Sequence, residues 1–283
     1  MTYPVMKRFT TLFAFFSVVL LGAFVANAQT TTNLVVTPSS PVFDSNNVVG
    51  VPLDSAPGYP FGSFASDGTG KTDMYFTPES LFNREVALAE IKSISYWTKT
   101  GAKHNVDPRD WYLNIYTKRY AGQIGTSFYG VRIGTEPYFS ENLVDPANTW
   151  NQWTTDGPNN YLRFFESTYG YFGSYTDPHF ASFVTGTSLA GSRGPGVLYA
   201  TQPILYFSPQ TASGWANGFT GQLDGLRIEL FDGSVANINF EAANQVAISR
   251  DACKNGGWKT LSRSDFSLFK NQGDCIQYVN TGK

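Results

Sequence analysis

The sequence has few of the residue types that build enzyme and metal centres. Its 283 residues include two cysteines and two histidines, and charged residues make up only 15% of the chain. Neither His104 nor His179 lies in an H-E-x-x-H or Cys/His motif, so we expect no zinc site. A Ser-His-Asp triad would need one of these histidines, and the serines in G-T-S-F-Y-G and G-T-S-L-A-G both miss the G-x-S-x-G pattern by one residue. We therefore expect no catalytic residue of these classes, no metal and no cofactor.

Long apolar runs are also scarce. The run Leu12–Leu21 follows Lys7 and Arg8 and precedes an A-N-A cleavage motif. It is short for a membrane span, and the whole layout is typical of a secretory signal peptide. We expect residues 1–28 to be removed and the exported chain to begin at Gln29 without a membrane span.

Strong charge of either sign is absent as well. The segment removed carries two basic and no acidic residues, which leaves 18 basic and 22 acidic residues, a net charge of −4. Such a chain is a poor ligand for polyanions, so nucleic acid is not an expected partner. Aromatic residues, at 16%, are as frequent as charged ones, a composition that favours β-strands in an exported protein.

Alternation of apolar and polar residues marks the strongest strands. In Asp110–Lys118 (D-W-Y-L-N-I-Y-T-K), one Trp, one Leu and one Ile alternate with two tyrosines and an asparagine. Glu90–Thr98 shows a similar pattern. Gly225–Phe231 and Ser234–Glu241 flank Asp232-Gly233, a pair that tolerates the positive φ of a type I′ turn, and together they predict a hairpin.

The other expected strands are short and separated by Gly, Pro and Asn. They are Leu34–Val36, Thr72–Phe76, Tyr129–Gly134, Thr149–Thr154, Tyr161–Ser167, Ala181–Val184 and Pro203–Ser208. Only Pro78–Val86 predicts a helix, of one or two turns. The pattern predicts an all-β fold, an antiparallel, jelly-roll-like β-sandwich over residues 46–242, with residues 29–45 as a leader.

The tail, residues 243–283, holds both cysteines, Cys253 and Cys275. In an exported chain a single pair of cysteines favours a disulfide, and the two are too far apart for a C-x-x-C redox motif. Closing the loop would stabilise the tail by roughly 3 kcal/mol in the chain-entropy model. The tail has too few apolar residues to fold alone, so we expect it to dock on the sandwich.

Two resemblances follow from these residues. The segments Cys253–Trp258 (C-K-N-G-G-W) and Phe269–Cys275 (F-K-N-Q-G-D-C) resemble the cysteine-bounded C-terminal tail of uncharacterised secreted bacterial proteins, a resemblance that covers about a tenth of the chain and implies no known activity. The body, through Leu223–Gly233 and Asn239–Glu241, loosely resembles lectin- and glucanase-type sandwiches. Such folds host binding modules and hydrolases alike.

The loop S-T-Y-G-Y-F-G-S-Y-T-D-P-H-F, which ends at Phe180, is the best candidate for a binding site. Its tyrosines are spaced by small residues, so their faces can stack on sugar C–H groups while the acidic and imidazole groups bond hydroxyls. The candidate ligand-binding residues are Tyr169, Tyr171, Tyr175, Asp177 and His179. The alternative is a surface loop that packs on itself.

A pair of carboxylates would indicate glycoside hydrolysis, because sandwich glycosidases use such a pair. The candidates are Glu136, Glu141, Asp145, Glu166, Glu229 and Glu241, and no E-x-D-x-x-E arrangement groups them on one strand face. The sequence therefore favours an exported, non-catalytic β-sandwich that binds a polysaccharide or a cell-surface component. Two alternatives stay open: a carbohydrate-active hydrolase or lyase with unrecognised carboxylates, and a structural envelope or matrix protein.

Overall fold

A computed structural model gives the fold of most of residues 29–283. It describes residues 29–59, 62–168, 173–188, 190–191, 193–215, 217–242, 247, 249–261, 263, 267 and 269–283. The expected signal peptide, residues 1–28, lies outside the described residues, as do Tyr169 and Tyr171.

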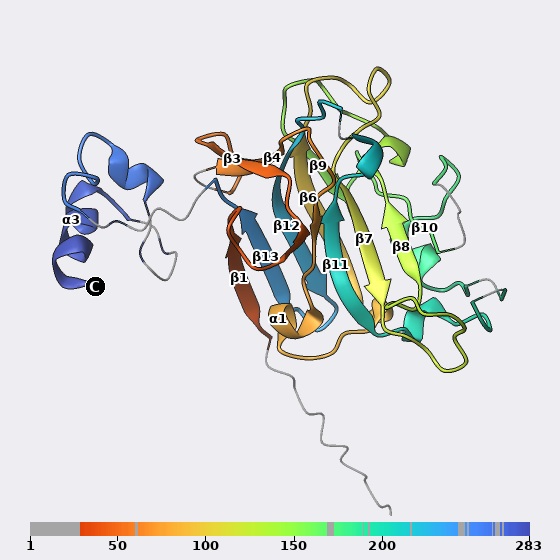
Figure 1. Ribbon diagram of the computed structural model, residues 1–283. Helices are drawn as coiled ribbons and strands as arrows, with labels where there is room; N and C mark the ends of the chain where they lie inside the picture. Colours follow the sequence, from red (N-terminus) through yellow and green to blue (C-terminus); the bar gives the residue numbers. More distant parts are fainter. Residues whose placement is uncertain are drawn as a thin grey trace, which may run out of the picture.

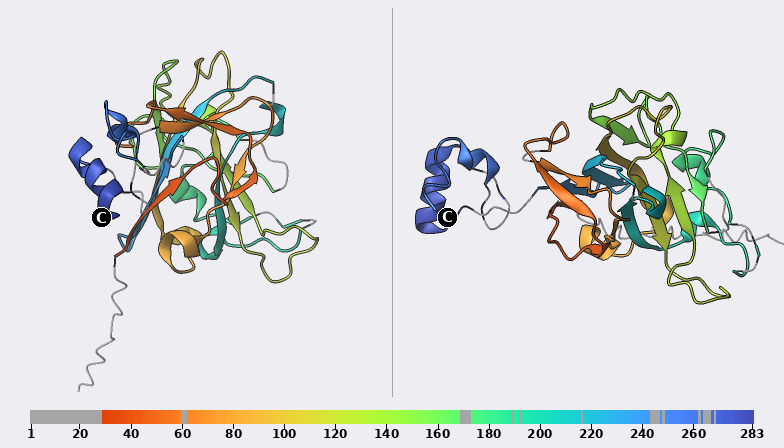
Figure 2. Two further views of the ribbon diagram at one scale, coloured as in Figure 1. Left: turned by 60° about the vertical axis from the view of Figure 1, so that its left-hand side comes forward. Right: turned by 45° about the horizontal axis from the view of Figure 1, so that its top comes forward.

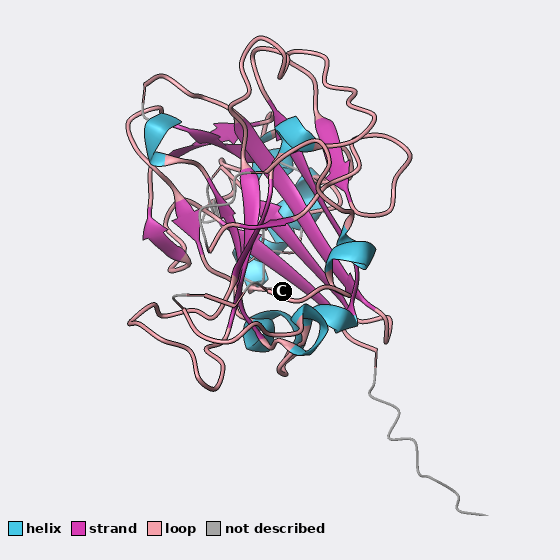
Figure 3. Cartoon of the chain, turned by 90° about the vertical axis from the view of Figure 1, so that its right-hand side faces the viewer, coloured by secondary structure: helices cyan, strands magenta, loops and turns pink. Residues whose placement is uncertain are grey.

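The body is a sandwich of two sheets (Figures 1 and 3). The seven described strands of the first sheet are β1 (Thr31–Val36), β3 (Val48–Pro52), β4 (Gly62–Ser66), β6 (Ile91–Lys99), β9 (Asn151–Thr154), β12 (Gln222–Leu230) and β13 (Val235–Phe240). Strand β12 lies at the centre, where it pairs with β6 on one edge and with β13 and β4 on the other. The predicted hairpin is confirmed, because β12 and β13 pair antiparallel around Asp232-Gly233. Its turn is not type I′, since Gly233 has a positive φ of 85° and Asp232 does not have a positive φ.

The second sheet completes the sandwich. Its described strands, in spatial order, are β10 (Phe165–Glu166), β8 (Arg132–Thr135), β7 (Tyr112–Thr117), β11 (Ile204–Gln210), β5 (Asp73–Met74) and β2 (Phe43–Ser45), and all these pairs are antiparallel. The all-β sandwich predicted from the alternation is therefore confirmed.

The core lies between the sheets and contains the apolar side chains that the alternation predicted. Leu113 and Ile115 of β7 face Ile94 and Tyr96 of β6 in one buried cluster. Each of these side chains is at most 2% exposed. Their strand neighbours point to the outside, so each sheet has an outer face built from the intervening residues.

Two short α-helices contribute side chains to the core between the sheets. The first, α1 (Pro78–Phe82), begins at Thr77, whose side chain accepts a hydrogen bond from the Ser80 N–H, and it confirms the predicted short helix. Proline at the first helical position fits this start because its missing N–H is not needed there. The turn ends at Asn83, which has a left-handed φ of 56°.

The segment Ala181–Val184 was predicted as a strand, and this prediction is wrong. It forms α2 (Phe180–Phe183) instead. Phe180 and Phe183 are three residues apart, so a helix directs both to one side, and both rings lie near Phe164, with centroid distances of 4.9 and 6.4 Å. A strand would direct them to opposite faces. The remaining short turns are the 3₁₀ helices η1 (Leu88–Glu90), η2 (Pro137–Phe139), η3 (Tyr199–Thr201), η4 (Ser213–Trp215) and η5 (Gly257–Thr260).

Residues 29–45, predicted as a leader with one short strand at Leu34–Val36, contribute β1 to the first sheet and β2 to the second. Strand β1 pairs in parallel with β13 along its whole length, and β2 pairs with β5. The parallel partner of β1 is about 200 residues further along the chain, with Thr31 opposite Val235. A local sequence pattern does not reveal such a pairing.

The tail forms a small unit with its own core. The disulfide between Cys253 and Cys275 is confirmed. Both sulfurs belong to a second buried cluster, which includes Leu261 and Phe269 and contains no residue of the sandwich core. Helix α3 (Gln272–Thr281) closes the unit, which Figure 2 shows as a lobe beside the sandwich. None of the described helices is long and apolar enough to cross a membrane.

Candidate binding site

The outer face of the second sheet is polar and aromatic rather than aliphatic. Alternation on β7 directs Tyr112, Asn114 and Tyr116 outward, away from the core. On the neighbouring strand β11, Gln210 pairs with Tyr112 and Ser208 pairs with Asn114. Tyr206 pairs with Tyr116 at the far end of the same two strands. Three rows of hydroxyl and amide groups therefore cross this face.

A hydrogen-bond network centred on Gln210 fixes these groups. Its amide oxygen accepts from Asn114 Nδ2 at 3.0 Å and from the Tyr112 hydroxyl at 3.3 Å. Its amide nitrogen donates to Ser208 Oγ at 2.7 Å and to the Tyr116 hydroxyl at 3.0 Å. Gln210 itself is 1% exposed, so the network holds the outward hydroxyl groups in fixed positions.

Aromatic rings gather at one end of this network. The aromatic group consists of Tyr75, Tyr116, Phe128, Tyr129 and Tyr206. Its neighbouring ring centroids lie 4.9 to 6.5 Å apart. Phe128 is 56% exposed and presents its ring to solvent. At the other end of β7, Trp215 lies against Tyr112 with centroids 5.5 Å apart.

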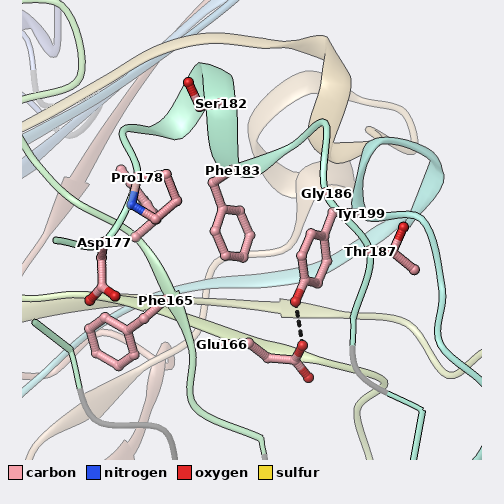
Figure 4. Close-up of a pocket in the computed structure, with 10 residues that line it drawn as sticks. Phe165, Glu166, Asp177, Pro178, Ser182, Phe183, Gly186, Thr187 and Tyr199 are labelled. Atoms are coloured by element: carbon pink, nitrogen blue, oxygen red, sulfur yellow. Dashed lines mark hydrogen bonds between the residues drawn. The ribbon is translucent and has the colours of Figure 1, made fainter.

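A pocket of about 360 Å³ opens at the β10 edge of the same sheet (Figure 4). Phe165 connects it to the outer face because its ring covers Gly134 of β8, where an added Cβ would lie 2.9 Å from the ring. The pocket is lined by Phe164, Phe165, Glu166, Asp177, Pro178, Ser182, Phe183, Gly186, Thr187 and Tyr199. Aromatic walls with two carboxyl groups suit a ligand that has both apolar faces and hydrogen-bonding groups.

Glu166 is the buried acid of this pocket. Burial raises the pKa of its carboxyl group, and the Tyr199 hydroxyl, which donates to Glu166 Oε2, and the charge of Arg193 only partly offset that effect. Figure 4 shows Glu166 reaching Tyr199 on one side of the pocket while Asp177 lies on the other. Glu166 therefore holds a proton more readily than an exposed glutamate.

The structure places three of the five predicted ligand-binding residues. Asp177 lines the pocket, where it accepts hydrogen bonds from the backbone N–H and the hydroxyl of Ser174. Tyr175 is 56% exposed, and its ring centroid lies 5.5 Å from those of Tyr138 and Phe139. Tyr169 and Tyr171 lie outside the described residues.

His179 lies away from the pocket. Its ring stacks on Tyr161 at 3.8 Å, and Nε2 is 2.6 Å from Glu141, which Arg163 also contacts at 2.9 Å. The arrangement anchors the end of the loop, because Arg163 also donates to the Asp177 carbonyl at 2.6 Å. His179 and Glu141 therefore support the loop and do not join Asp177 in one site.

The other candidate carboxylates do not line this pocket. Glu229 pairs with two cationic side chains at 2.6 and 2.7 Å. Asp145 accepts a hydrogen bond from the buried His104 at 2.9 Å. Burial raises the pKa of both Glu136 and Glu241. Among the described residues, no three His, Cys, Asp or Glu side chains gather as a metal site.

Sequence reasoning missed the outer face as a site. The alternation on β7 correctly predicts the core-facing residues. The tyrosines on the opposite face of the strand were not predicted as binding residues. Tyr75 and Phe128 reach the aromatic group from segments far apart in the sequence, and Tyr199 reaches Glu166 across 33 residues. A comparison with known protein families, curated proteins and solved structures finds no match for this chain.

Proposed function

We propose that this protein is exported and binds a surface polysaccharide, without cleaving it, through the outer face of its second sheet. The observation that carries the proposal is the Gln210 network with aromatic rings at both of its ends. Apart from Tyr112, the groups of the network are themselves buried, so their role is to hold the rings in place. Phe128 at one end is exposed and Tyr112 at the other end is half-buried, and such rings stack on the C–H faces of sugars. Trp215 and Phe128 lie at opposite ends of β7, beside Tyr112 and Tyr116, whose backbones are about 13 Å apart. This spacing suits an extended chain of sugar units better than a single one.

Export is part of this proposal and has two supports. The first 28 residues have the layout of a signal peptide, and the tail carries a disulfide, which is compatible with an oxidising compartment. N-terminal sequencing of protein recovered outside the cytoplasm should begin at Gln29. A start at Met1 or Met6 would contradict cleavage.

Glycan binding is tested with a glycan array and with pull-down on insoluble polysaccharides. We expect Phe128→Ala to weaken binding about fivefold, because an exposed stacking ring contributes on the order of 1 kcal/mol. Phe231→Ala is the matched control, since Phe231 is 70% exposed and lies outside the aromatic group. A folded protein that retains no glycan, or a Phe128→Ala variant that binds like the wild type, would count against the proposal.

Glycan cleavage is the second candidate function, and Glu166 is the observation in its favour. A carboxyl with a raised pKa can protonate a leaving group, and Asp177 supplies a second carboxylate in the same pocket. Release of reducing sugar ends from a bound polysaccharide would support it, provided that Glu166→Gln abolishes release and leaves binding intact. Equal release by the Glu166→Gln variant would exclude this role for Glu166.

A further inference from the structure

A second pocket lies on the opposite side of the sandwich, on the outer face of the first sheet. It has a volume of about 320 Å³ and lies beside β9 and the loop that follows it. It is lined by Trp97, Val144, Trp150, Asn151, Gln152, Thr154, Gly157, Pro158, Asn159 and Asn160. It shares no residue with the aromatic group or with the pocket at Glu166.

Strand register directs two residues into this pocket. On β6 and β9, Tyr96 pairs with Trp153, and both are buried in the sandwich with exposures of 2% and 0%. The next pair, Trp97 with Gln152, therefore points to the opposite, outer side. Both tryptophans of the pocket, Trp97 and Trp150, are half-buried, so each presents part of its ring to a ligand.

Neighbouring side chains fix the second tryptophan. Trp150 Nε1 donates to Asp54 Oδ1 at 3.1 Å, and the Lys99 ammonium lies 5.7 Å from the centre of the Trp150 ring. Asp54 also accepts hydrogen bonds from Lys99 and from Gln222. The ring orientation is thus set before any ligand arrives, which lowers the entropy cost of binding.

The polar groups of the pocket divide into two kinds. The Asn160 amide is occupied by the backbone of Val144, through hydrogen bonds of 2.6 and 2.9 Å. The amides of Gln152 and Asn159 and the indole N–H of Trp97 make no hydrogen bond within the described part of the chain. These three groups are available to a ligand and offer it both donors and acceptors.

Charge defines the ligand further. None of the ten lining residues is charged. Three charged residues lie beside the lining: Lys99 and Asp54, which form an ion pair with each other, and Asp156, which accepts a hydrogen bond from the lining Thr154. Two aromatic faces with free amides and no charged lining residue match a neutral ligand that has many hydroxyl groups and C–H faces better than an anion.

We propose that this pocket binds sugar units of a neutral polysaccharide, with Trp97 and Trp150 as stacking faces and Gln152 and Asn159 as hydrogen-bonding groups. The inference rests on the proposed function only for its ligand class, since the residues and the face are different. With sites on both outer faces, one molecule can bridge two polysaccharide chains, and linked sites raise the overall avidity.

The test uses the exported chain labelled with [15N]tryptophan and titrated with laminaran, mannan and xyloglucan, with polygalacturonate as the charged comparison. We expect a neutral polysaccharide to shift the indole signals of Trp97 and Trp150. The signals of Trp111 and Trp153, both 0% exposed, should not move. Signals are assigned with single Trp→Phe variants.

Variants then separate this pocket from the aromatic group. Trp97→Ala should weaken binding at the pocket about tenfold, and Gln152→Ala about threefold. The Gln152 side chain is exposed and makes no hydrogen bond within the described part of the chain, so its loss does not threaten folding. Phe231→Ala should change nothing. The wild type should also cross-link soluble polysaccharide, which is measured as turbidity. Trp97→Ala should abolish the turbidity, because only the site on the second sheet would still bind.

The outcomes for the two proposals are distinct. If Phe128→Ala removes binding while Trp97→Ala and Gln152→Ala have no effect, the pocket inference is wrong and the proposed function stands. If the two pocket variants remove all binding while Phe128→Ala has no effect on binding, the inference stands and the site proposed on the second sheet is wrong. Indole signals that respond to no neutral polysaccharide overturn the inference.

Discussion

Individual buried polar residues depend on partners from distant segments. His104 is 1% exposed and lies between Asp145, 2.9 Å from Nδ1, and Asp110, 3.1 Å from Nε2. Burial lowers the pKa of His104, but the bonds and charges of the two aspartates outweigh this and leave the pKa raised. Asp110 also accepts from Thr98, which in turn accepts from the Trp153 indole at 2.7 Å. The histidine therefore connects Asp145 to Asp110 and, through Asp110, to Thr98 of β6.

Two buried carboxyl groups at the end of β13 retain protons unusually well. Burial raises the pKa of Asp224 to about 7, even though its carboxyl accepts hydrogen bonds from the backbone N–H groups of Ala56, Gly225 and Phe240. Burial, together with the charge of Asp224, raises the pKa of Glu241 to about 8. Both groups are therefore protonated in the folded chain at pH values at which the unfolded chain has already lost those protons.

We expect the free energy of unfolding to fall as the pH rises from 5 to 9. A carboxyl whose pKa is raised by folding stabilises the fold fully below its unfolded pKa, near 4, and that contribution is lost as the pH passes through about 7 and 8. At about 1.4 kcal/mol per pKa unit, the loss between pH 5 and pH 9 should be roughly 7 kcal/mol, from about two units for Asp224 and about three for Glu241, measured by urea unfolding at the two pH values. Glu241→Gln cannot ionise and should reduce the difference, whereas an unchanged pH dependence would show that Glu241 does not cause it.

At the scale of elements, β12 is shaped by one irregular position. Its register with β6 shifts between Asp224 and Arg227, and Gly225 within this bulge has a positive φ of 59°. The Tyr59 ring packs directly on Gly225, where an added Cβ would lie 2.4 Å from Cε2 of that ring. The bulge lets β12 pair with β4 before it and with β13 after it on the same edge.

Gly225→Ala should therefore destabilise the sandwich by about 2 kcal/mol, because the new methyl group meets both an unfavourable backbone conformation and the Tyr59 ring. Gly214→Ala is the matched control, since nothing lies within 4 Å of its Cβ position and its φ is not in the left-handed range. Thermal unfolding of the two variants measures the difference. Equal stability of the two would mean that β12 does not need the bulge.

The whole molecule contains two apolar clusters of very different size. The sandwich core includes residues from both sheets and from helices α1 and α2. The tail cluster is built from a few residues around the disulfide, such as Ala247 and Leu261. An apolar set this small needs a covalent link to stay folded, so the disulfide stabilises the tail and not the sandwich.

Cys275→Ser should unfold the tail and leave the sandwich intact. The loss is about 3 kcal/mol in the chain-entropy model, which is enough to unfold a unit of this size. Hydrogen exchange should show lost protection in α3 and unchanged protection in β6, β7 and β12. Cooperative loss of protection in these strands as well would show that the tail and the sandwich form one folding unit. Docking of the tail on the sandwich stays a prediction.

The sequence by itself determined the features that depend on neighbouring residues. Alternation in Asp110–Lys118 separated the core-facing Leu113 and Ile115 from outward tyrosines, Asp232-Gly233 defined the hairpin, and a single cysteine pair defined the disulfide. These features are local or leave a single choice, so composition and period are sufficient.

Only the tertiary structure decided what depends on distant segments. The parallel pairing of β1 with β13 and the helix at Phe180 and Phe183 follow from which surfaces are left to be covered once the sheets have formed. Both candidate binding surfaces belong here: Tyr75 and Phe128 lie side by side on the second sheet, and Trp97 of β6 lines one pocket with Trp150, which precedes β9. Side-chain direction is a local property, but strand order and register are set by packing over the whole core, and these bring the binding residues together.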